Sequence, residues 1–408
     1  MIWYLFVPLA PYLAWLLWAA AFHPIPLSYN WRSLWQRWAG TLSTLGAIAI
    51  VVMVFVVVLS MAQGISTAYV RSGRDDQVVV LRQNSRVEMM STLTLDQGRL
   101  ISTHPLVARD ALGPLATTDL IVSRQLPLAD GTGSLSVTVR GTTPAGIRMR
   151  SQVRMVRGRW FRPDLSEAVV PLKMLTRYAG LGLGGTFTMA GRTWSIVGVF
   201  DGAGSVYDSE IWTDVNDLRQ AFRRHNAVSS MIVRLRSASD VPDFIRDMDR
   251  DVRLKLEAKP EPDYFAELGD AGRPMQILGR IITAILTVGA VFAAMNTMYA
   301  TVSGRTAEIG TLRALGFRRR QILACFQWEA ILLTALGGIL GGLLSLLFNG
   351  TRTGTVNMNT WSDVSYAFAV TPALVAQGIA FSVLMGIAGG FLPAWRASRI
   401  PITEAMRS

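Results

Sequence analysis

Long uncharged apolar runs alternate along this chain with stretches that carry almost all of its charge. At 1.5 Å of rise per residue, a helix of about 20 residues crosses a hydrocarbon core of about 30 Å. The pattern therefore predicts membrane helices at 42–63, 277–302, 326–348 and 372–392. Residues 1–22 form a fifth run, which contains no charged residue.

The run at 1–22 allows two interpretations. It has neither a basic start nor a small-x-small cleavage site, so we expect a retained helix and not a signal peptide. Pro8, Pro11 and the Trp and Tyr side chains also allow a kinked or interfacial segment, because these aromatic residues favour the headgroup level. If it spans the membrane, we expect its N-terminus outside and its helix beside the bundle of its own subunit or at the rim of a dimer.

Residues 64–276 show the shorter periods of an α+β domain. Apolar and polar residues alternate, or β-branched residues cluster, in segments that predict strands, namely 77–82, 135–140, 193–200 and 231–235. Helical patterns lie at 94–103, which begins with a capping-box sequence at Thr94, and at 214–224 and 240–255. We expect the charged stretch 236–275 to be a helical stalk that leads into the next span.

The positions of the arginines orient the spans. Ten arginines, against only two glutamates, lie in segments 23–41, 303–325 and 393–408. Because positive residues remain on the cytoplasmic side, these segments are predicted to be a cytoplasmic amphipathic segment, a cytoplasmic loop and a cytoplasmic tail. Residues 64–276 and the short loop 349–371 then lie outside, as in a multi-pass protein of the bacterial inner membrane with a large periplasmic domain.

Composition agrees with a membrane protein, since 50% of the residues are hydrophobic and 17% are charged. The net charge of +12 indicates contact with anionic membrane lipids and not with nucleic acid, because no basic and aromatic patch lies in a soluble module.

Cys325 is the only cysteine, which excludes an internal disulfide, and we interpret it as a packing residue. The three histidines are too far apart to predict a metal site.

No nucleotide-binding or hydrolase motif is found. None of the three lysines lies in a GxxxxGK[ST] loop, and there is no GxSxG elbow. We therefore expect the chain to be no enzyme and to bind no cofactor or metal itself.

The loop 303–325 contains the segment with the clearest functional signal. If residues 306–316 form a helix, Ile309, Leu312 and Leu315 with Gly316 lie on one stripe, while Glu308 and Arg313 project from other faces. Such a charged amphipathic helix between two spans is suited to lying in the groove of a partner.

Three motifs of the last 130 residues resemble the permeases of MacB/FtsX-type (type VII) ABC transporters. They are AEIGTLRALGFRRRQIL at 307–323, GGILGG at 337–342 and LPAWRASRIPITEAMRS at the C-terminus. The layout extends the resemblance to most of the chain, although that family usually has four spans. The resemblance implies a fold of four membrane helices with a large α+β periplasmic domain, and the run at 1–22 would add an extra N-terminal hydrophobic helix to it.

The same resemblance implies the function. Glu308, Gly310, Leu312, Arg313, Ala314, Leu315 and Gly316 would form the coupling helix that docks on a separate ATPase subunit, which would bind ATP and Mg. Further partners would be a second permease copy and, in some systems, a periplasmic adaptor. The output would be export or extraction of lipid or lipoprotein. The alternative is a non-transport scaffold that transmits force to periplasmic partners such as cell-wall hydrolases.

Two features inside the spans remain open from sequence. Gly337, Gly338, Gly341 and Gly342 give overlapping small-xxx-small patterns, which allow close packing within one subunit or a moving seam. Glu329 lies one turn inside the cytoplasmic boundary. A functional role, snorkelling to the interface or pairing with one of the arginines 318–320 are all possible there.

Overall fold

The chain divides into two units, each described here by itself. In a computed structural model, residues 11, 12, 14, 16, 38–251, 254–269, 273–357 and 362–401 are described. The helical unit comprises 1–62, 274–351 and 368–408, and the α+β domain comprises 63–273 and 352–367. The interpretations of 1–22 and 23–41 fall largely outside the described residues, as does the end of the tail from residue 402.

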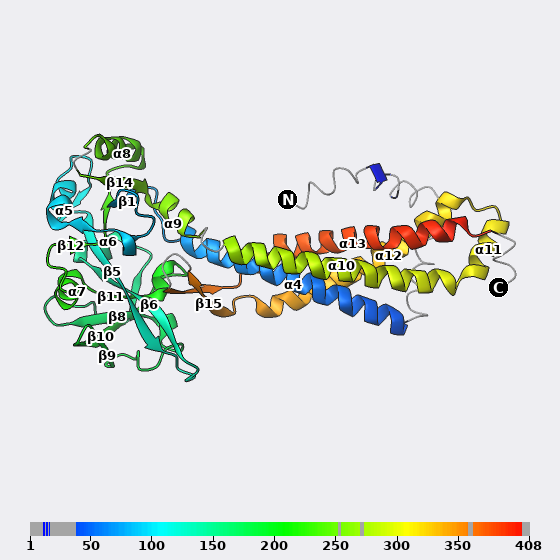
Figure 1. Cartoon of the computed structure of the whole chain (residues 1–408), viewed down its shortest axis with the longest axis horizontal. Coiled ribbons are helices and arrows are strands. Elements are labelled where there is room, and N and C mark those ends of the chain that lie inside the picture. Colours follow the sequence, from blue (N-terminus) through cyan, green and yellow to red (C-terminus); the bar gives the residue numbers. More distant parts are fainter. Residues whose placement is uncertain are drawn as a thin grey trace. The chain divides into compact units, whose positions relative to one another are not determined.

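Four helices of the described chain are long and apolar enough to cross a membrane. They include the four predicted spans and extend beyond them, and they run along one another in Figure 1. The four are α4 (Trp38–Val70), α10 (Arg273–Ser303), α12 (Arg319–Ser345, then a 3-10 turn at Leu346–Phe348) and α13 (Pro372–Arg399). The short helix α11 (Thr306–Ala314) lies between α10 and α12 in the chain.

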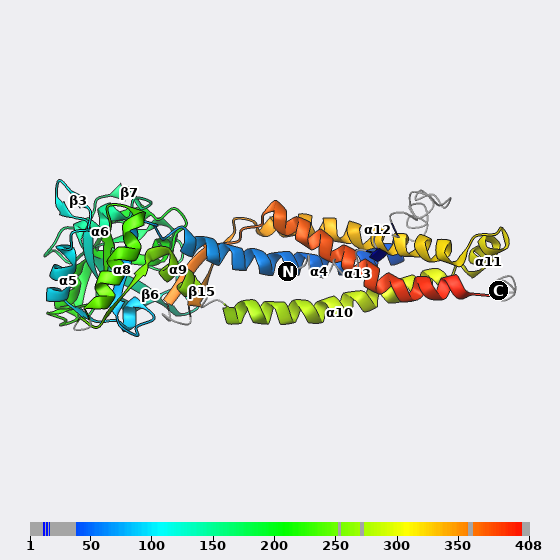
Figure 2. The ribbon, with the colours of Figure 1, turned by 90° about the horizontal axis from the view of Figure 1, so that it is seen from above.

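Helices α12 and α13 lie side by side, and α11 lies at one end of the helical unit between α10 and α12 (Figure 2). The described residues near the N-terminus pack on the same pair. Leu16 is buried among Ala324, Ile331 and Ile387, and its carbonyl accepts a hydrogen bond from the Trp328 indole at 3.1 Å. Leu16 therefore packs against helices of its own subunit, which is one of the two positions expected for the run at 1–22.

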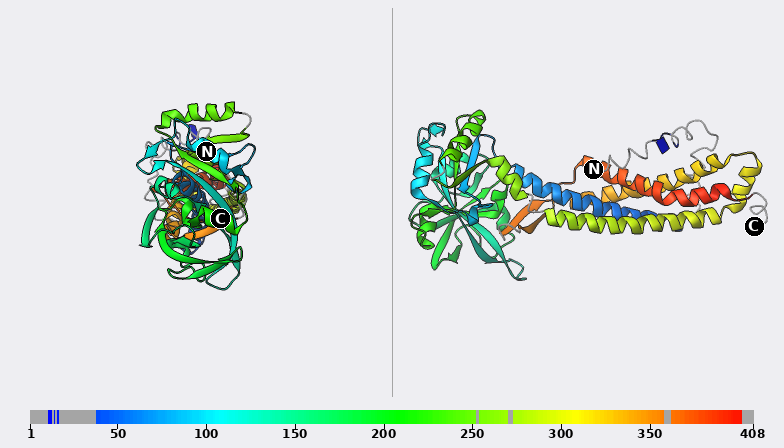
Figure 3. Two further views of the ribbon diagram at one scale, coloured as in Figure 1. Left: turned by 90° about the vertical axis from the view of Figure 1, so that its left-hand side faces the viewer. Right: turned by 45° about the horizontal axis from the view of Figure 1, so that its top comes forward.

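The α+β domain, of which Figure 3 gives two further views, is built on a ten-stranded mixed sheet. The strand order is β14-β1-β13-β5-β6-β11-β8-β10-β7, and β9 also pairs with β10. Its strands are β1 (Gln77–Arg82), β5 (Ala116–Pro127), β6 (Ser134–Thr142), β7 (Arg154–Gly158), β8 (Glu167–Pro171), β9 (Thr186–Met189), β10 (Arg192–Asp201), β11 (Glu210–Asp214), β13 (Ser230–Arg234) and β14 (Leu256–Pro260).

Short elements complete the domain. Its helices are α5 (Leu95–Ser102), α6 (Pro144–Met149), α7 (Val215–Ala221), α8 (Val241–Arg250) and α9 (Glu261–Gly269), with 3-10 turns η1 (Glu88–Met90), η2 (Leu172–Met174), η3 (Val206–Ser209) and η4 (Ala238–Asp240). Three two-stranded pairs are β2 (Leu93–Thr94) with β12 (Ala227–Val228), β3 (Arg109–Asp110) with β4 (Gly113–Pro114), and β15 (Arg352–Asn357) with β16 (Ser362–Ala367).

Most local predictions for this domain are confirmed. The four predicted strands correspond to β1, β6, β10 and β13, and the three predicted helices correspond to α5, α7 and α8. The Thr94 hydroxyl accepts the Gln97 amide N–H, and the Gln97 side chain accepts the Thr94 N–H at 2.8 Å, which is a complete capping box.

One prediction for the connecting segments is wrong. Residues 236–275 are not simply a helical stalk, because β14 lies within them and pairs antiparallel with β1 at the edge of the sheet. Segment 349–371, which was predicted only as a short loop, contains the β15–β16 hairpin, which belongs to the α+β domain. The Asp363 carboxylate of this hairpin accepts hydrogen bonds from Arg177 at 2.9 Å and from the Tyr178 hydroxyl at 2.7 Å.

Candidate functional site

A buried arginine fixes the start of α11 to α12. Arg305 is only 7% exposed, and its Nη1 donates to Oε2 of Glu329 at 3.0 Å, while its Nε donates to Glu308 at 2.9 Å. Its guanidinium also lies 5.4 Å from the centre of the Phe326 ring. Breaking such a buried pair on one side costs several kcal/mol, because the remaining charge stays desolvated. The position of α11 therefore depends on Arg305 and Glu329.

This contact identifies a partner for Glu329 that the sequence did not suggest. The carboxylate is buried and binds Arg305, so it does not snorkel to the interface. The sequence separation of 24 residues explains why spacing along one helix could not reveal the pair.

The predicted apolar stripe of α11 is divided between the interior and the surface. Ile309 is buried against Met298, Ile322 and Phe326, and Leu312 packs at the edge of the same cluster. The prediction that the whole stripe lies in a partner's groove is therefore wrong for Ile309. Leu315, in contrast, is 72% exposed.

A turn with hydrogen-bonded ends follows α11. Gly316 adopts a left-handed φ of 96°, and the Phe317 N–H donates to the Leu312 carbonyl at 3.1 Å, as at helix ends closed by glycine. The Arg318 N–H then donates to the Gln321 side chain at 2.6 Å where α12 begins. These bonds hold Leu315 at the tip of a defined turn.

The residues predicted for this site thus differ in accessibility. Gly310 is buried, and Leu312 and Arg313 are half-buried. The exposed members form what we call the α11 surface, which consists of Glu308, Ala314, Leu315 and Gly316.

The four glycines of α12 are sites of close packing within the subunit. A Cβ on Gly337 would lie 2.8 Å from Cγ2 of Ile48 in α4, and one on Gly342 would lie 2.8 Å from Cγ1 of Val375 in α13. Gly341 faces α4 in the same way, and Gly338 faces Ser382 of α13. Small residues at these positions allow the three backbones to approach closely.

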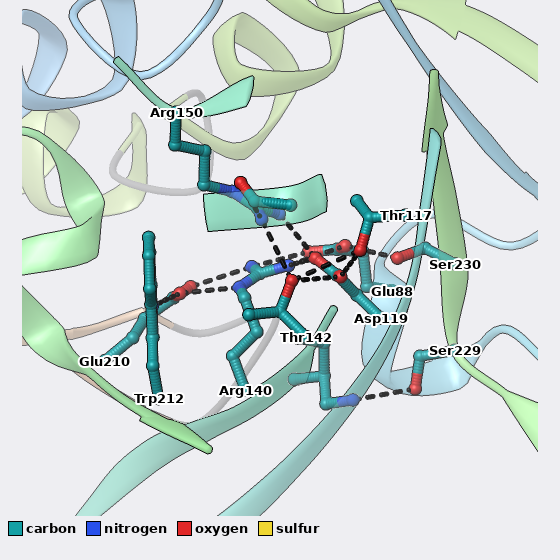
Figure 4. Close-up of polar contacts among 12 residues, drawn as sticks. Glu88, Thr117, Asp119, Arg140, Thr142, Arg150, Glu210, Trp212, Ser229 and Ser230 are labelled. Atoms are coloured by element: carbon teal, nitrogen blue, oxygen red, sulfur yellow. Dashed lines mark hydrogen bonds and ion pairs between the residues drawn. The ribbon is translucent and has the colours of Figure 1, made fainter. Parts of the chain in front are cut away.

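The α+β domain contains a buried ionic network that sequence analysis did not single out (Figure 4). Arg140, which is 3% exposed, pairs with Glu88 at 3.0 Å, Asp119 at 2.9 Å and Glu210 at 2.6 Å. Burial alone would lower the pKa of Arg140, but the three carboxylates outweigh it and raise that pKa well above its usual value. Alternation in 135–140 places Arg140 on the polar face with Ser136 and Thr138, so the pattern predicted neither its burial nor its three partners.

Arg150 extends the network on its other side. Its guanidinium pairs with Asp119 and lies 5.3 Å from the centre of the Tyr207 ring. Burial would raise the pKa of Asp119, but Arg150 and Arg140 outweigh it and hold that pKa below its usual value. Asp119 is therefore an ionised member of the core.

Glu261 at the start of α9 lies beside this network and is only partly satisfied. Its Oε2 accepts the Arg74 N–H at 3.0 Å, which joins the chain after α4 to the start of α9. Within the described chain, its Oε1, the Tyr207 hydroxyl and Nε of Arg150 are buried without a hydrogen-bond partner. Burial raises the pKa of Glu261 to about 8.

Comparison with known families identifies both units. The profile described as MacB-like periplasmic core domain matches residues 41–251, which is more than half of the chain. The profile described as FtsX-like permease C-terminal matches residues 280–402, including α11 and Glu329. The chain belongs to the MacB/FtsX-type permease family.

Curated relatives of this permease carry the names of export proteins. The macrolide export ATP-binding/permease protein MacB of Nitrobacter winogradskyi is 31% identical over 198 residues, which cover 48% of this chain and 27% of the relative. The protein of the same name from Bdellovibrio bacteriovorus is 27% identical over 292 residues, covering 66% of this chain and 43% of the relative. The chain thus spans less than half the length of these relatives.

A solved structure of the periplasmic region of MacB from Actinobacillus actinomycetemcomitans also matches, with a TM-score of 0.36 and 12% identity, over 47% of this chain and 92% of that chain. Family membership makes this protein an ABC transporter permease of the inner membrane, with the α+β domain in the periplasm. The α11 surface then belongs to the loop that the arginine distribution places in the cytoplasm.

Proposed function

We propose that this permease couples ATP hydrolysis by a separate ATPase subunit to conformational change of its periplasmic domain. In this proposal, the ATPase subunit binds ATP and Mg, and the α11 surface is its docking site. Two permease copies would form the working unit with two ATPase subunits.

The Arg305–Glu329 pair is the observation that supports the proposal. A docking helix can transmit a displacement only if it is attached firmly to the helices that must move. Arg305 lies between α10 and α11 and is bound to α12, so movement of α11 would reach two membrane helices directly. Leu315 at the tip of the turn offers an exposed apolar side chain for the partner.

Export or extraction of a lipid or lipoprotein is the proposed output. The relatives are named for export of macrolides and, in Pseudomonas putida, of pyoverdine. The large size of the periplasmic domain favours export or extraction, with an adaptor as a further partner, over a scaffold that regulates cell-wall hydrolases.

The test is assembly of the full chain with its cognate ABC ATPase subunit. Leu315→Asp would place a charge in the proposed contact, and its desolvation would cost several kcal/mol. We expect co-purification of the ATPase to fall by more than about tenfold, together with ATPase stimulation in proteoliposomes.

Leu112→Asp is the matched control, because Leu112 is 77% exposed in the α+β domain and the charge change is the same. It should leave assembly unchanged. Normal co-purification and stimulation with Leu315→Asp would show that the α11 surface is not the docking site. ATP hydrolysis by the purified permease alone would contradict the separate ATPase subunit.

A further inference from the structure

A groove with a basic, aromatic lining lies between α10 and α13 in the helical unit. It encloses about 780 Å³, which is the size range of small-molecule sites. Its lining combines apolar residues with hydroxyl groups and two arginines. The residues that matter here are Tyr299, Ser303, Thr306, Trp395, Arg396 and Arg399.

The two arginines carry charge that the described protein does not neutralise. Arg396 and Arg399 are exposed, and no ion pair joins either of them to a carboxylate in the described part of the chain. Their charges do favour the C-terminal end of α13 through the helix dipole. That role would be served equally by arginines pointing into bulk water, whereas these two line a groove.

Aromatic rings hold both guanidinium groups. The Arg396 guanidinium lies 5.9 Å from the centre of the Tyr299 ring, and that of Arg399 lies 4.1 Å from the centre of the Trp395 ring. A guanidinium that stacks on a ring keeps the N–H groups along its edge available. These N–H groups can donate two parallel hydrogen bonds to the oxygens of one phosphate.

The groove has the polarity gradient of the membrane interface. Leu392 and Trp395 are 45% and 42% exposed, and they lie on α13 before the two arginines, on the membrane side. Ser303 and Thr306 line the groove where α10 ends and α11 begins. The arginine distribution places this end of the helices at the cytoplasmic leaflet. An acyl chain could thus lie along the apolar residues while a phosphate reaches the arginines.

We propose that this groove binds the phosphodiester headgroup of an anionic membrane phospholipid from the cytoplasmic leaflet. Basic pockets between helices on this side are typical sites for such headgroups. The site is independent of the proposed docking on the α11 surface, since Leu315 does not line the groove.

The experiment measures binding of fluorescent phosphatidylglycerol to the purified full-length permease in mixed micelles. The double variant Arg396→Gln/Arg399→Gln should weaken binding by about tenfold or more, because each arginine near a headgroup contributes on the order of 1 kcal/mol. The matched control is Arg318→Gln/Arg319→Gln, which removes the same charge from the same side but outside the groove. It should change affinity less than about twofold.

A second variant tests the groove without changing charge. Ser303→Trp would fill the space beside the arginines and should also weaken binding, while thermal unfolding reports whether each variant is folded. Equal losses in both double variants would indicate nonspecific attraction and overturn the proposal. Full competition by millimolar inorganic phosphate would also overturn it, in favour of a soluble phosphate ligand.

Two other occupants of the groove are distinguished in the same series. If the Arg396→Gln/Arg399→Gln variant binds lipid normally but loses dimers in light scattering, the groove is a contact with a second copy. If removal of residues 402–408 raises the affinity strongly, the tail of the chain occupies the groove. Either result would overturn the lipid site.

Discussion

Two buried arginines, one in each unit, use the same chemistry in different surroundings. Arg140 binds three carboxylates that are themselves buried, on η1, β5 and β11. Arg305 binds one buried carboxylate, Glu329, and one exposed carboxylate, that of Glu308, whose side chain is 57% exposed. In the first arrangement every partner is buried, whereas the second reaches the surface. We infer that Arg140 maintains a fixed core and that Arg305 holds a surface helix in place.

The largest effect is expected from Arg140→Leu. It would leave Glu88, Asp119 and Glu210 buried without their shared cation, and loss of one partner of a buried pair already costs about 3–5 kcal/mol. We expect the periplasmic domain of the full chain to lose cooperative thermal unfolding in detergent. Arg148→Leu is the control, because Arg148 forms a partly exposed pair with Asp110, and exposed pairs contribute little to stability. Similar stability of the two variants would contradict the contrast drawn here.

An intermediate effect is expected at the second arginine. Glu329→Gln removes the charge that Arg305 binds, and Arg305→Gln removes its counterpart. Each single variant should lower the free energy of unfolding and the ATPase stimulation. The double variant should lose less unfolding free energy than the two single variants together, with a coupling energy of about 1–3 kcal/mol. Thermal unfolding of all four proteins, combined with ATPase assays, measures the coupling. Additive losses would show that the pair does not hold α11.

A further effect concerns pH. Because Glu261 has a folded pKa of about 8 and a usual value of 4.5, the folded state retains a proton that the unfolded state releases. Its contribution to stability is complete below pH 4.5 and is lost as the pH rises through 8. Glu261→Gln should therefore flatten the fall in unfolding temperature between about pH 5 and pH 9. Glu267→Gln, on the exposed side of the same helix, should retain the wild-type slope. An unchanged slope in Glu261→Gln would assign the titration to another group.

Sequence predicted the elements of this protein better than their side-chain pairings. Strands such as β1 and the capped helix α5 depend on local alternation and local hydrogen bonds, so they were accessible to pattern analysis. The partners of Arg140 and Glu329 come from segments 21 or more residues away, and no local rule specifies them. The interior position of Ile309 was missed because an amphipathic helix can turn its apolar residues toward its own subunit as well as toward a partner.

Loop 349–371 was underestimated for a related reason. The hairpin strands β15 and β16 are short and polar, and they become ordered structure only by pairing with each other and with the domain. Asp363 shows this dependence, because its partners Arg177 and Tyr178 lie about 185 residues earlier in the chain.

The hairpin also sets an order of events during biogenesis. Residues 352–367 follow α12, so a ribosome makes them after the rest of the periplasmic domain. Until they cross the membrane, Arg177 and Tyr178 lack the carboxylate that they bind in the finished protein. Completion of the domain is thereby linked to insertion of the last two spans. A nascent chain arrested before residue 352 should expose this region to periplasmic proteases, and release of the full chain should protect it.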